Sequence, residues 1–342
     1  MAFANGRILW NRLSRWRFVR RIPRRLAVNF RRPQLGCKFP DKIQIEATSR
    51  CNLRCPSCSY AKGGVAGKHL APAELRRVLA ALPFRPRRVI LSGIGEPLVN
   101  PEFFALVDIL AERGVRCVFF TNGTLLSAKN RHAILARENI DEVCISCDGA
   151  SKSTFEALRL GANFEKWTEA VRQFLGEAKR SPTAPRMVAN IVASKGNLTE
   201  LGDILRLVKD LGFDSANLLE PIPVDEVAAA LFAADSEIDA LRSGGLLKQA
   251  REIGLRVDWY LRRKGSPPES MVRCISPWEY IFVHANGDVA PCSAVFGQGK
   301  AAVMGNIFAQ PFNDIWRGEC FRTFRRQNAT GTNSQCRLCP YY

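Results

Sequence analysis

The apolar positions after residue 40 form two kinds of segment that alternate along the chain. Short runs rich in β-branched and aromatic residues are typical of strands, and they occupy residues 42–48, 88–93, 116–123, 142–149, 186–194 and 215–221. Between them, apolar residues recur every three or four positions, as in amphipathic helices, at 72–83, 100–114, 127–139 and 198–212. Strands alternating with helices predict a parallel sheet. We therefore expect an α/β fold, a partial (β/α)6 TIM-like barrel or a wound open sheet, with its chemistry at the C-terminal ends of the strands.

The last third of the chain departs from this repeat. Residues 225–256 have a helical pattern broken at Gly244 and Gly245, and a strand pattern follows at 256–261. Gly, Pro and Ser then mark a linker. Beyond it, two apolar runs flank Asn286-Gly287, a pair that favours the type I′ turn of a β-hairpin. We expect four parts: an N-terminal arm (1–40), a barrel (41–260), a linker (261–273) and a small C-terminal domain (274–342).

Composition sets the class of protein. With 342 residues, 46% of them hydrophobic, the chain can bury a large core, which excludes overall disorder. It has no apolar run of eighteen residues and no secretory signal pattern, so we expect a cytoplasmic protein. In a reducing compartment, its twelve cysteines favour metal ligation or buried thiols over disulfides.

The net charge of +18 is concentrated in the arm, where residues 1–40 hold eleven Lys and Arg and no acidic residue. The remainder has 39 basic and 32 acidic residues, which gives no sign of specific nucleic-acid binding. Within the arm, Leu9, Leu13, Trp16 and Val19 have helical spacing among arginines. This basic amphipathic helix could contact an anionic membrane surface or an acidic partner, or pack its apolar stripe on the barrel; a mitochondrial presequence is a further interpretation.

Three cysteines, Cys51, Cys55 and Cys58, fall within eight residues after the first strand. Three thiolates can hold one face of a 4Fe-4S cluster and leave one iron without a protein ligand. A zinc site completed by a distant residue, or three unrelated thiols, are the alternatives. The spacing resembles the loop of the radical S-adenosylmethionine (SAM) enzymes. That resemblance implies that SAM binds the open iron and is cleaved to a 5′-deoxyadenosyl radical, which abstracts hydrogen from the substrate.

Further motifs of this family follow in order on the expected strands. The resemblance implies that Tyr60 contacts the adenine of SAM and that the segment 92–98 binds its amino group. It also implies that Ser146 and Asp148 contact the ribose, with Cys147 facing away. Finally, it implies that Arg159 pairs with the SAM carboxylate and that an amide on the fifth strand contacts the ribose or the methionine part. Two positions depart from the family pattern: Ser57 replaces an aromatic residue and Ile94 a glycine. The implied SAM contacts are Tyr60, Gly93, Gly95, Glu96, Ser146, Asp148, Arg159 and Asn190.

Four further cysteines follow the linker: Cys274, Cys292, Cys336 and Cys339. Four thiolates are the ligand count of a fully protein-ligated cluster or of a structural zinc. With its hairpin and its Cys-x2-Cys pair, this region resembles the SPASM/twitch domains that carry auxiliary 4Fe-4S clusters. The chain has cysteines for one auxiliary cluster, as in the shorter twitch form.

The remaining cysteines and histidines are predicted to be structural. The cysteines are expected to be small buried side chains, and the histidines surface or loop residues, so a hydrolase with a Ser/His or Cys/His pair is not supported. They are Cys37, Cys117, Cys144, Cys147, Cys320, His69, His132 and His284.

The two predicted clusters suit a two-electron oxidation, in which the auxiliary cluster accepts an electron from the substrate radical. We expect a radical SAM oxidoreductase that acts on a sugar, cyclitol or other small hydroxylated molecule and receives electrons from a flavodoxin or ferredoxin. A peptide (RiPP) maturase is the first alternative; a non-catalytic iron-sulfur electron carrier or binding protein is the second. The catalytic base is not assigned, and its candidates are Glu220, Asp225, Asp258 and Glu279.

Overall fold

A computed structural model describes residues 39–40, 42–58, 67–221, 230–261, 274, 276–293, 302–336 and 339. The basic helix of the arm, Cys37, Tyr60, Asp225 and residues 262–273 of the expected linker lie outside these residues.

The described residues form one sheet of ten strands in the order β10-β9-β8-β1-β2-β3-β4-β5-β6-β7. All neighbours from β8 to β7 are parallel, and β9 and β10 add antiparallel strands at one edge. The strands are β1 (Lys42–Ile45), β2 (Arg88–Leu91), β3 (Arg116–Thr121), β4 (Ile140–Ser146), β5 (Arg186–Val192), β6 (Ser215–Leu219), β7 (Arg256–Trp259), β8 (Tyr280–Val283), β9 (Asp288–Ala290) and β10 (Gly305–Asn306).

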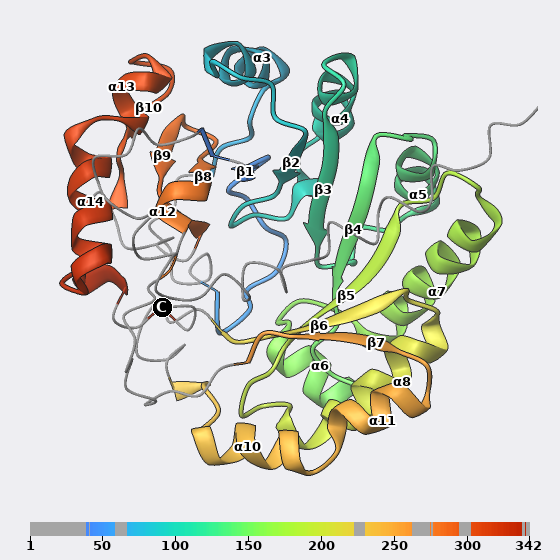
Figure 1. The fold of residues 1–342 in the computed structure, drawn as a ribbon. Coiled ribbons are helices and arrows are strands. Elements are labelled where there is room, and N and C mark those ends of the chain that lie inside the picture. The colour runs from blue at the N-terminus through green and yellow to red at the C-terminus, as the bar shows by residue number, and fades with distance from the viewer. Residues whose placement is uncertain are drawn as a thin grey trace, which may run out of the picture.

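Helices connect the parallel strands and lie outside the curved sheet (Figure 1). Those of the barrel region are α3 (Pro72–Ala81), η3 (Pro97–Val99), α4 (Phe103–Glu112), α5 (Ala128–Leu135), α6 (Lys152–Leu158), α7 (Phe164–Arg180), η4 (Leu198–Glu200), α8 (Leu201–Leu211), α10 (Asp235–Ser243) and α11 (Leu246–Glu252). The C-terminal part contains α12 (Ser276–Glu279), α13 (Phe312–Trp316), α14 (Glu319–Thr330) and η7 (Ser334–Cys336).

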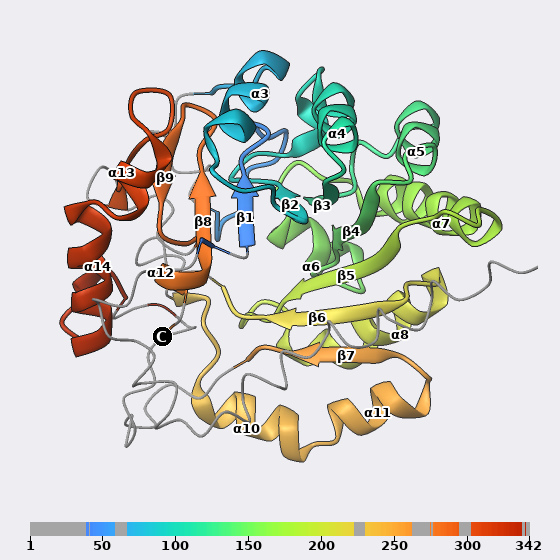
Figure 2. The ribbon, with the colours of Figure 1, turned by 45° about the horizontal axis from the view of Figure 1, so that its top comes forward.

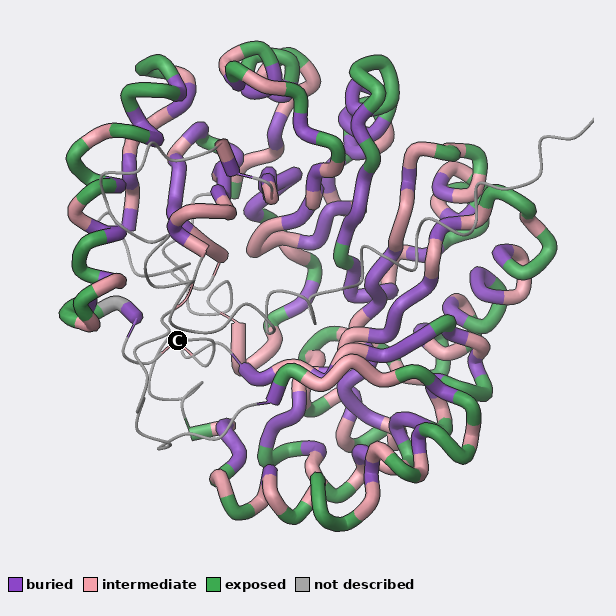
Figure 3. The backbone as a smooth tube through the Cα atoms, viewed as in Figure 1, coloured by how far each residue is buried: buried purple, intermediate pink, exposed green. Residues whose placement is uncertain are grey.

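The sequence pattern explains how helices and sheet meet. In α8, Leu201, Ile204, Leu205 and Val208 are all buried, and each large aliphatic side chain removed from water stabilises the fold by about 2 kcal/mol. The helix ends at Gly212, whose φ of 97° is a left-handed conformation that glycine adopts most easily. Figure 3 shows the buried residues concentrated in the strands and on the helix faces turned toward them.

Alternate residues of each strand face opposite sides of the sheet. Val143 and Ile145 of β4, like Met187, Ala189 and Ile191 of β5, belong to the core shared with the helices. The residues between them face the other side, which we call the inner face. Figure 2 shows the strands side by side, with β8 next to β1.

The predicted α/β fold with a mostly parallel sheet is confirmed. The six predicted strands are present, as are the seventh at β7 and the helix break at Gly244-Gly245. The hairpin turn differs in detail: Gly287 N–H donates to His284 O (2.9 Å), so Ala285 and Asn286 occupy the corner and Gly287 follows with a φ of 89°. This is the geometry of a turn followed by a bulge, not of a two-residue type I′ turn.

The C-terminal region continues the sheet of the barrel, since β8 pairs with β1 along Lys42–Ile45. The boundaries drawn from sequence between barrel, linker and C-terminal domain stay a prediction. None of the helices within the described ranges is long and apolar enough to cross a lipid bilayer.

Candidate active site

The loop after β1 carries Cys51, Cys55 and Cys58 and lies against the loop after β2. Gly95 N–H donates to Thr48 O (3.2 Å), and Glu96 N–H donates to Arg50 O (2.9 Å). A Cβ at Gly95 would lie 2.3 Å from the carbonyl oxygen of Arg50. Glycine is therefore required here for the approach of the cysteine loop, a purpose that the sequence motif did not reveal.

The three thiols of this loop lie close enough to influence one another. Burial, together with the charges of Cys55 and Cys58, raises the pKa of Cys51 to about 11. In the described part of the chain, no group of three His, Cys, Asp or Glu side chains is placed to hold a single metal ion. A cubane does not need that arrangement, because each thiolate ligates a different iron. Three soft thiolates that repel one another as anions fit such a cluster, which would neutralise them.

Asn122, at the end of β3, contacts this loop and was not identified from the sequence. Its Nδ2 lies 2.9 Å from Asn52 Oδ1 and 4.0 Å from Cys51 Sγ. Its carbonyl oxygen accepts a hydrogen bond from the Trp167 indole (3.0 Å). An Asn-Gly pair after a strand is a common turn signal, and nothing else in the sequence marked this residue.

Glu96 is buried, and its carboxylate is engaged within the protein. It accepts hydrogen bonds from Thr121 Oγ1 (2.7 Å), Asn122 N (2.7 Å) and Leu98 N (3.2 Å). Burial raises its pKa to about 7 against the opposing effect of these bonds. The side chain thus ties the loop after β2 to the end of β3, and its predicted contact with the SAM amino group stays a prediction.

Asp148 and Arg159, predicted as two separate SAM contacts, form an ion pair. Arg159 Nε donates to Asp148 Oδ2 (2.6 Å), and Asp148 Oδ1 accepts from Val192 N (2.8 Å). Arg159 also interacts with the thiol of Cys55, where its positive charge opposes the rise in pKa that burial causes. The pair links the ends of β4 and β5 to the cysteine loop, and Cys147 faces the core as strand alternation predicted.

The other predicted SAM contacts lie on the same C-terminal edge. Gly93 packs on Glu46, since a Cβ there would lie 2.3 Å from Glu46 Cγ. Ser146 and Asn190 pair in register on β4 and β5, and Asn190 Oδ1 accepts a hydrogen bond from Asn217 Nδ2 (2.9 Å). The predicted SAM contacts that the structure describes therefore come from the C-terminal parts of β2, β4 and β5 and the segments that follow them.

Glu46 connects this edge to the C-terminal region. It is 2% exposed. Its Oε1 accepts from Ile94 N (3.0 Å), in the loop after β2, and its Oε2 accepts from Ala285 N (3.1 Å), in the turn after β8. No local sequence pattern indicates this role, because the second contact joins residues 239 positions apart.

The candidate bases have different surroundings. Glu220 is buried directly after β6, Asp258 lies on β7 beside Arg256, and Glu279 ends α12. These positions do not select one of them as the base.

Three of the four C-terminal cysteines interact through their charges. Burial raises the pKa of Cys336 to about 12, with contributions from Cys339 and Cys274. Asn328 Nδ2 lies 3.8 Å from Cys336 Sγ. Cys292 follows β9 and packs with Tyr280 around Phe282. The structure thus brings Cys274, Cys336 and Cys339 near one another, and a cluster that takes Cys292 as its fourth ligand stays a prediction.

A buried arginine holds the helices around these cysteines together. Arg325 of α14 donates to Pro277 O (2.8 Å) and Trp316 O (2.7 Å), and its guanidinium lies 4.1 Å from the centre of the Trp316 ring. Nearby, the Tyr280 hydroxyl contacts Gln44 Oε1, and Gln44 Nε2 donates to Ser92 O (2.9 Å). The C-terminal cysteine region is therefore joined to the barrel through β8 and β1.

The prediction of small buried cysteines is confirmed for Cys117, Cys144 and Cys147 and is wrong for Cys320, which is exposed. His69 Nδ1 lies 2.9 Å from Thr48 Oγ1, and His284 Nδ1 lies 3.7 Å from Glu46 Oε2.

Comparison with known families places the two cysteine groups in two matched regions. The model of the radical SAM superfamily matches residues 45–208, and the model of an iron-sulfur cluster-binding domain, SPASM, matches residues 274–340. Each match contains one cysteine group.

Similar proteins cover most of the chain. The PqqA peptide cyclase of Streptomyces rochei is 29% identical over 334 residues, 90% of this chain and 83% of that protein. The AdoMet-dependent heme synthase of Methanosarcina barkeri is 26% identical over 328 residues, 88% of this chain and 89% of that protein. Among solved structures, Streptococcus suis SuiB bound to precursor peptide SuiA has a TM-score of 0.69 and 16% identity, over 93% of this chain and 73% of that one.

Proposed function

This chain belongs to the radical SAM superfamily and carries a C-terminal SPASM domain, and on that premise we propose that it is an enzyme that modifies a peptide. The sequence alone favoured a small hydroxylated substrate and placed a peptide second. The relatives support the reverse order, since they include the PqqA peptide cyclase and the mycofactocin maturases of mycobacteria.

The cofactors would divide between the two cysteine groups. When bound at Cys51, Cys55 and Cys58, a 4Fe-4S cluster with SAM supplies the radical chemistry that breaks an unactivated C–H bond. A second cluster at the four C-terminal cysteines would have no open iron and is suited to electron transfer. We therefore propose a net oxidation at a peptide C–H bond. In it, Glu46, Glu96 and Asp148 hold the loops of the site in place.

The observation that best supports a peptide is the balance of charge on the inner face of β4 to β7. Arg186 Nη1 pairs with Glu142 Oε2 (3.2 Å), and Arg256 pairs with Asp258 (3.0 Å). The alternative that the heme synthase relative suggests is a carboxylated tetrapyrrole. Its carboxylates would require unpaired cations on the protein, whereas a peptide backbone offers both hydrogen-bond donors and acceptors to paired charges.

Exposed apolar side chains add to this support. Phe120, Leu160 and Tyr260 are large hydrophobic residues that remain exposed. Phe120 and Tyr260 lie on or directly after strands of the barrel, and Leu160 O accepts from Arg54 N (2.9 Å) beside the cysteine loop. Apolar surface at these places suits the side chains of a peptide better than a sugar or cyclitol.

The test is a comparison of substrates with the anaerobically reconstituted protein, SAM and a reductant. Candidate peptides encoded beside the gene, a carboxylated porphyrin and a cyclitol are supplied separately, and products are identified by mass spectrometry. We expect one peptide to lose two hydrogens while SAM is consumed. A modified porphyrin or cyclitol, with unchanged peptides, would contradict the proposal.

A further inference from the structure

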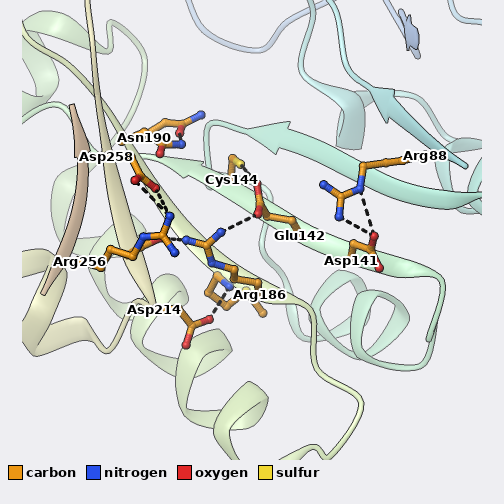
Figure 4. Close-up of polar contacts among 12 residues, drawn as sticks. Arg88, Asp141, Glu142, Cys144, Arg186, Asn190, Asp214, Arg256 and Asp258 are labelled. Atoms are coloured by element: carbon orange, nitrogen blue, oxygen red, sulfur yellow. Dashed lines mark hydrogen bonds and ion pairs between the residues drawn. The ribbon is translucent and has the colours of Figure 1, made fainter. Parts of the chain in front are cut away.

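A polar row crosses the inner face at the height of the proposed SAM site. Ser146, Asn190, Asn217 and Asp258 are successive partners in the registers of β4, β5, β6 and β7. Figure 4 shows Asn190 and Asp258 on the same side of the sheet, with Arg186 and Arg256 beside them. Three strand spacings separate the ends of the row, or about 14 Å, the length of about four extended residues. A peptide lying along the row would thus reach from the SAM site to β7.

Strand β7 and Tyr260, which directly follows it, present charged and aromatic groups at the far end of this row. Arg256, Asp258 and Tyr260 occur at every second position and so share the inner face. The side chains of Arg256 and Asp258 are 47% and 32% exposed, and Tyr260 is 38% exposed. Burial and the charge of Asp258 raise the pKa of Tyr260, which is also influenced by Arg256, Glu142 and Arg186. The four charged side chains that act on Tyr260 come from β4, β5 and β7 and lie near one another in Figure 4.

The Arg256–Asp258 pair has bonding capacity left. Nη2 of Arg256 makes both contacts, at 3.1 and 3.0 Å to the two carboxylate oxygens. Its Nε and Nη1 donors make no hydrogen bond to any residue that the structure describes. Each carboxylate oxygen of Asp258 can accept a further bond. Because a pair this exposed contributes little stability, a ligand can rearrange it at small cost.

A peptide group complements this arrangement. Its carbonyl oxygen matches the open donors of Arg256, and its N–H matches Asp258. The neighbouring pair is satisfied differently, since Arg186 donates both to Glu142 and to Ser215 Oγ (2.5 Å). These two hydrogen bonds hold Arg186 against the inner face of the sheet, whereas Arg256 and Asp258 are available to a ligand.

We propose that Arg256, Asp258 and Tyr260 form the subsite that binds the substrate peptide beside the residue to be modified. Arg256 donates to a peptide carbonyl, Asp258 accepts from a peptide N–H, and the Tyr260 ring packs on the adjoining side chain. This inference rests on the proposed peptide function and names residues that determine specificity.

The test uses reconstituted protein with SAM and a pool of octapeptides of defined sequence, acetylated and amidated so that their ends carry no charge. Retention in equilibrium dialysis is measured by mass spectrometry for wild type, Arg256→Ala, Asp258→Ala and a swapped variant with Arg256→Asp and Asp258→Arg. The swap keeps the ion pair and net charge but exchanges donor and acceptor. Controls are Arg251→Ala on α11 and Asp210→Ala on α8, both exposed.

We expect the single variants and the swap to retain the best-bound peptides at least tenfold less than wild type, and the controls to match wild type. Thermal unfolding midpoints verify that each variant folds. If the swap does not fold, Arg256→Lys takes its place, because lysine keeps the charge but loses the planar fork of the guanidinium group. Peptide retention by the swap or by both single variants at the wild-type level would overturn the subsite and leave the peptide function standing. If wild type retains no peptide, the proposed function fails and the subsite with it.

Discussion

The guanidinium of Arg159 donates to the carboxylate of Asp148, with 2.6 Å between Nε and Oδ2. Both residues come from motifs that the sequence assigned to different parts of SAM. The ion pair joins the two residues, and through Arg159 it connects the end of β4 to the thiol of Cys55. A change in Asp148 is therefore expected to act on SAM binding and on the cysteine loop together.

Asp148→Asn removes the charge that holds Arg159 but keeps an acceptor for Val192 N–H. We expect SAM to bind at least tenfold more weakly, because a hydrogen bond between charged groups is worth about 2 kcal/mol. Equilibrium dialysis with labelled SAM measures this. Asp203→Asn, in an exposed pair with Arg206 on α8, is the control, and equal affinity in the two variants would contradict the role given to Asp148.

Glu46 is expected to couple the loop after β2 to the turn after β8. Glu46→Ala leaves the N–H groups of Ile94 and Ala285 without their acceptor. We therefore expect the free energy of unfolding to fall by about 3 kcal/mol. Glu46→Gln keeps one acceptor oxygen and should fall between alanine and wild type. Urea unfolding followed by tryptophan fluorescence measures both.

The control for Glu46 is Glu112→Ala, which removes an exposed pair with Arg76 and should leave the unfolding midpoint unchanged. Two Glu46 variants as stable as wild type would rule out the coupling.

The stability of the protein should depend on pH through Glu96, whose pKa burial raises from 4.5 to about 7. Between these values the folded state holds a proton that the unfolded chain has released. The free energy of unfolding therefore falls as pH rises through this window, by about 3 kcal/mol in total. Glu96→Gln removes this component, so wild type should lose more stability than the variant between about pH 5 and about pH 8. Parallel pH profiles from urea unfolding would contradict the assignment.

Iron content should report two separate clusters. Anaerobic reconstitution is expected to give about eight iron atoms per chain, and about four after replacement of Cys51, Cys55 and Cys58 by alanine. Cys320→Ala, at an exposed cysteine, should keep the full content. Four iron atoms and one zinc in wild type would remove the auxiliary cluster and the electron-transfer argument with it.

The sequence predicted the features that short segments encode. The strands, the helix pattern of 198–212 and the two cysteine groups each lie within local patterns of spacing, and the fold class follows from their order. Pairings between distant segments could not be predicted in this way. Nothing local indicates that β8 joins β1, or that Glu46 accepts from Ala285.

Within the site, the structure adds roles that the sequence motifs did not indicate. Gly95 and Glu96 were selected for contact with SAM, which stays a prediction. In the structure Gly95 also admits the backbone of the cysteine loop, and Glu96 binds the end of β3. Small residues and buried carboxylates serve packing and ligand binding alike, so a motif predicts where such a residue lies but not which of these functions it has. Asn122 was not predicted as a site residue, because its contacts with Asn52 and Cys51 form only in the folded loop.

The central claim is that the three-thiol loop supports SAM cleavage. The direct measurement is the yield of 5′-deoxyadenosine when reconstituted protein is reduced anaerobically with SAM. We predict 5′-deoxyadenosine and methionine in equal amounts from wild type and from Cys320→Ala, and none once Cys51, Cys55 and Cys58 are replaced by alanine. A fully reconstituted wild-type protein that forms no 5′-deoxyadenosine would contradict the account.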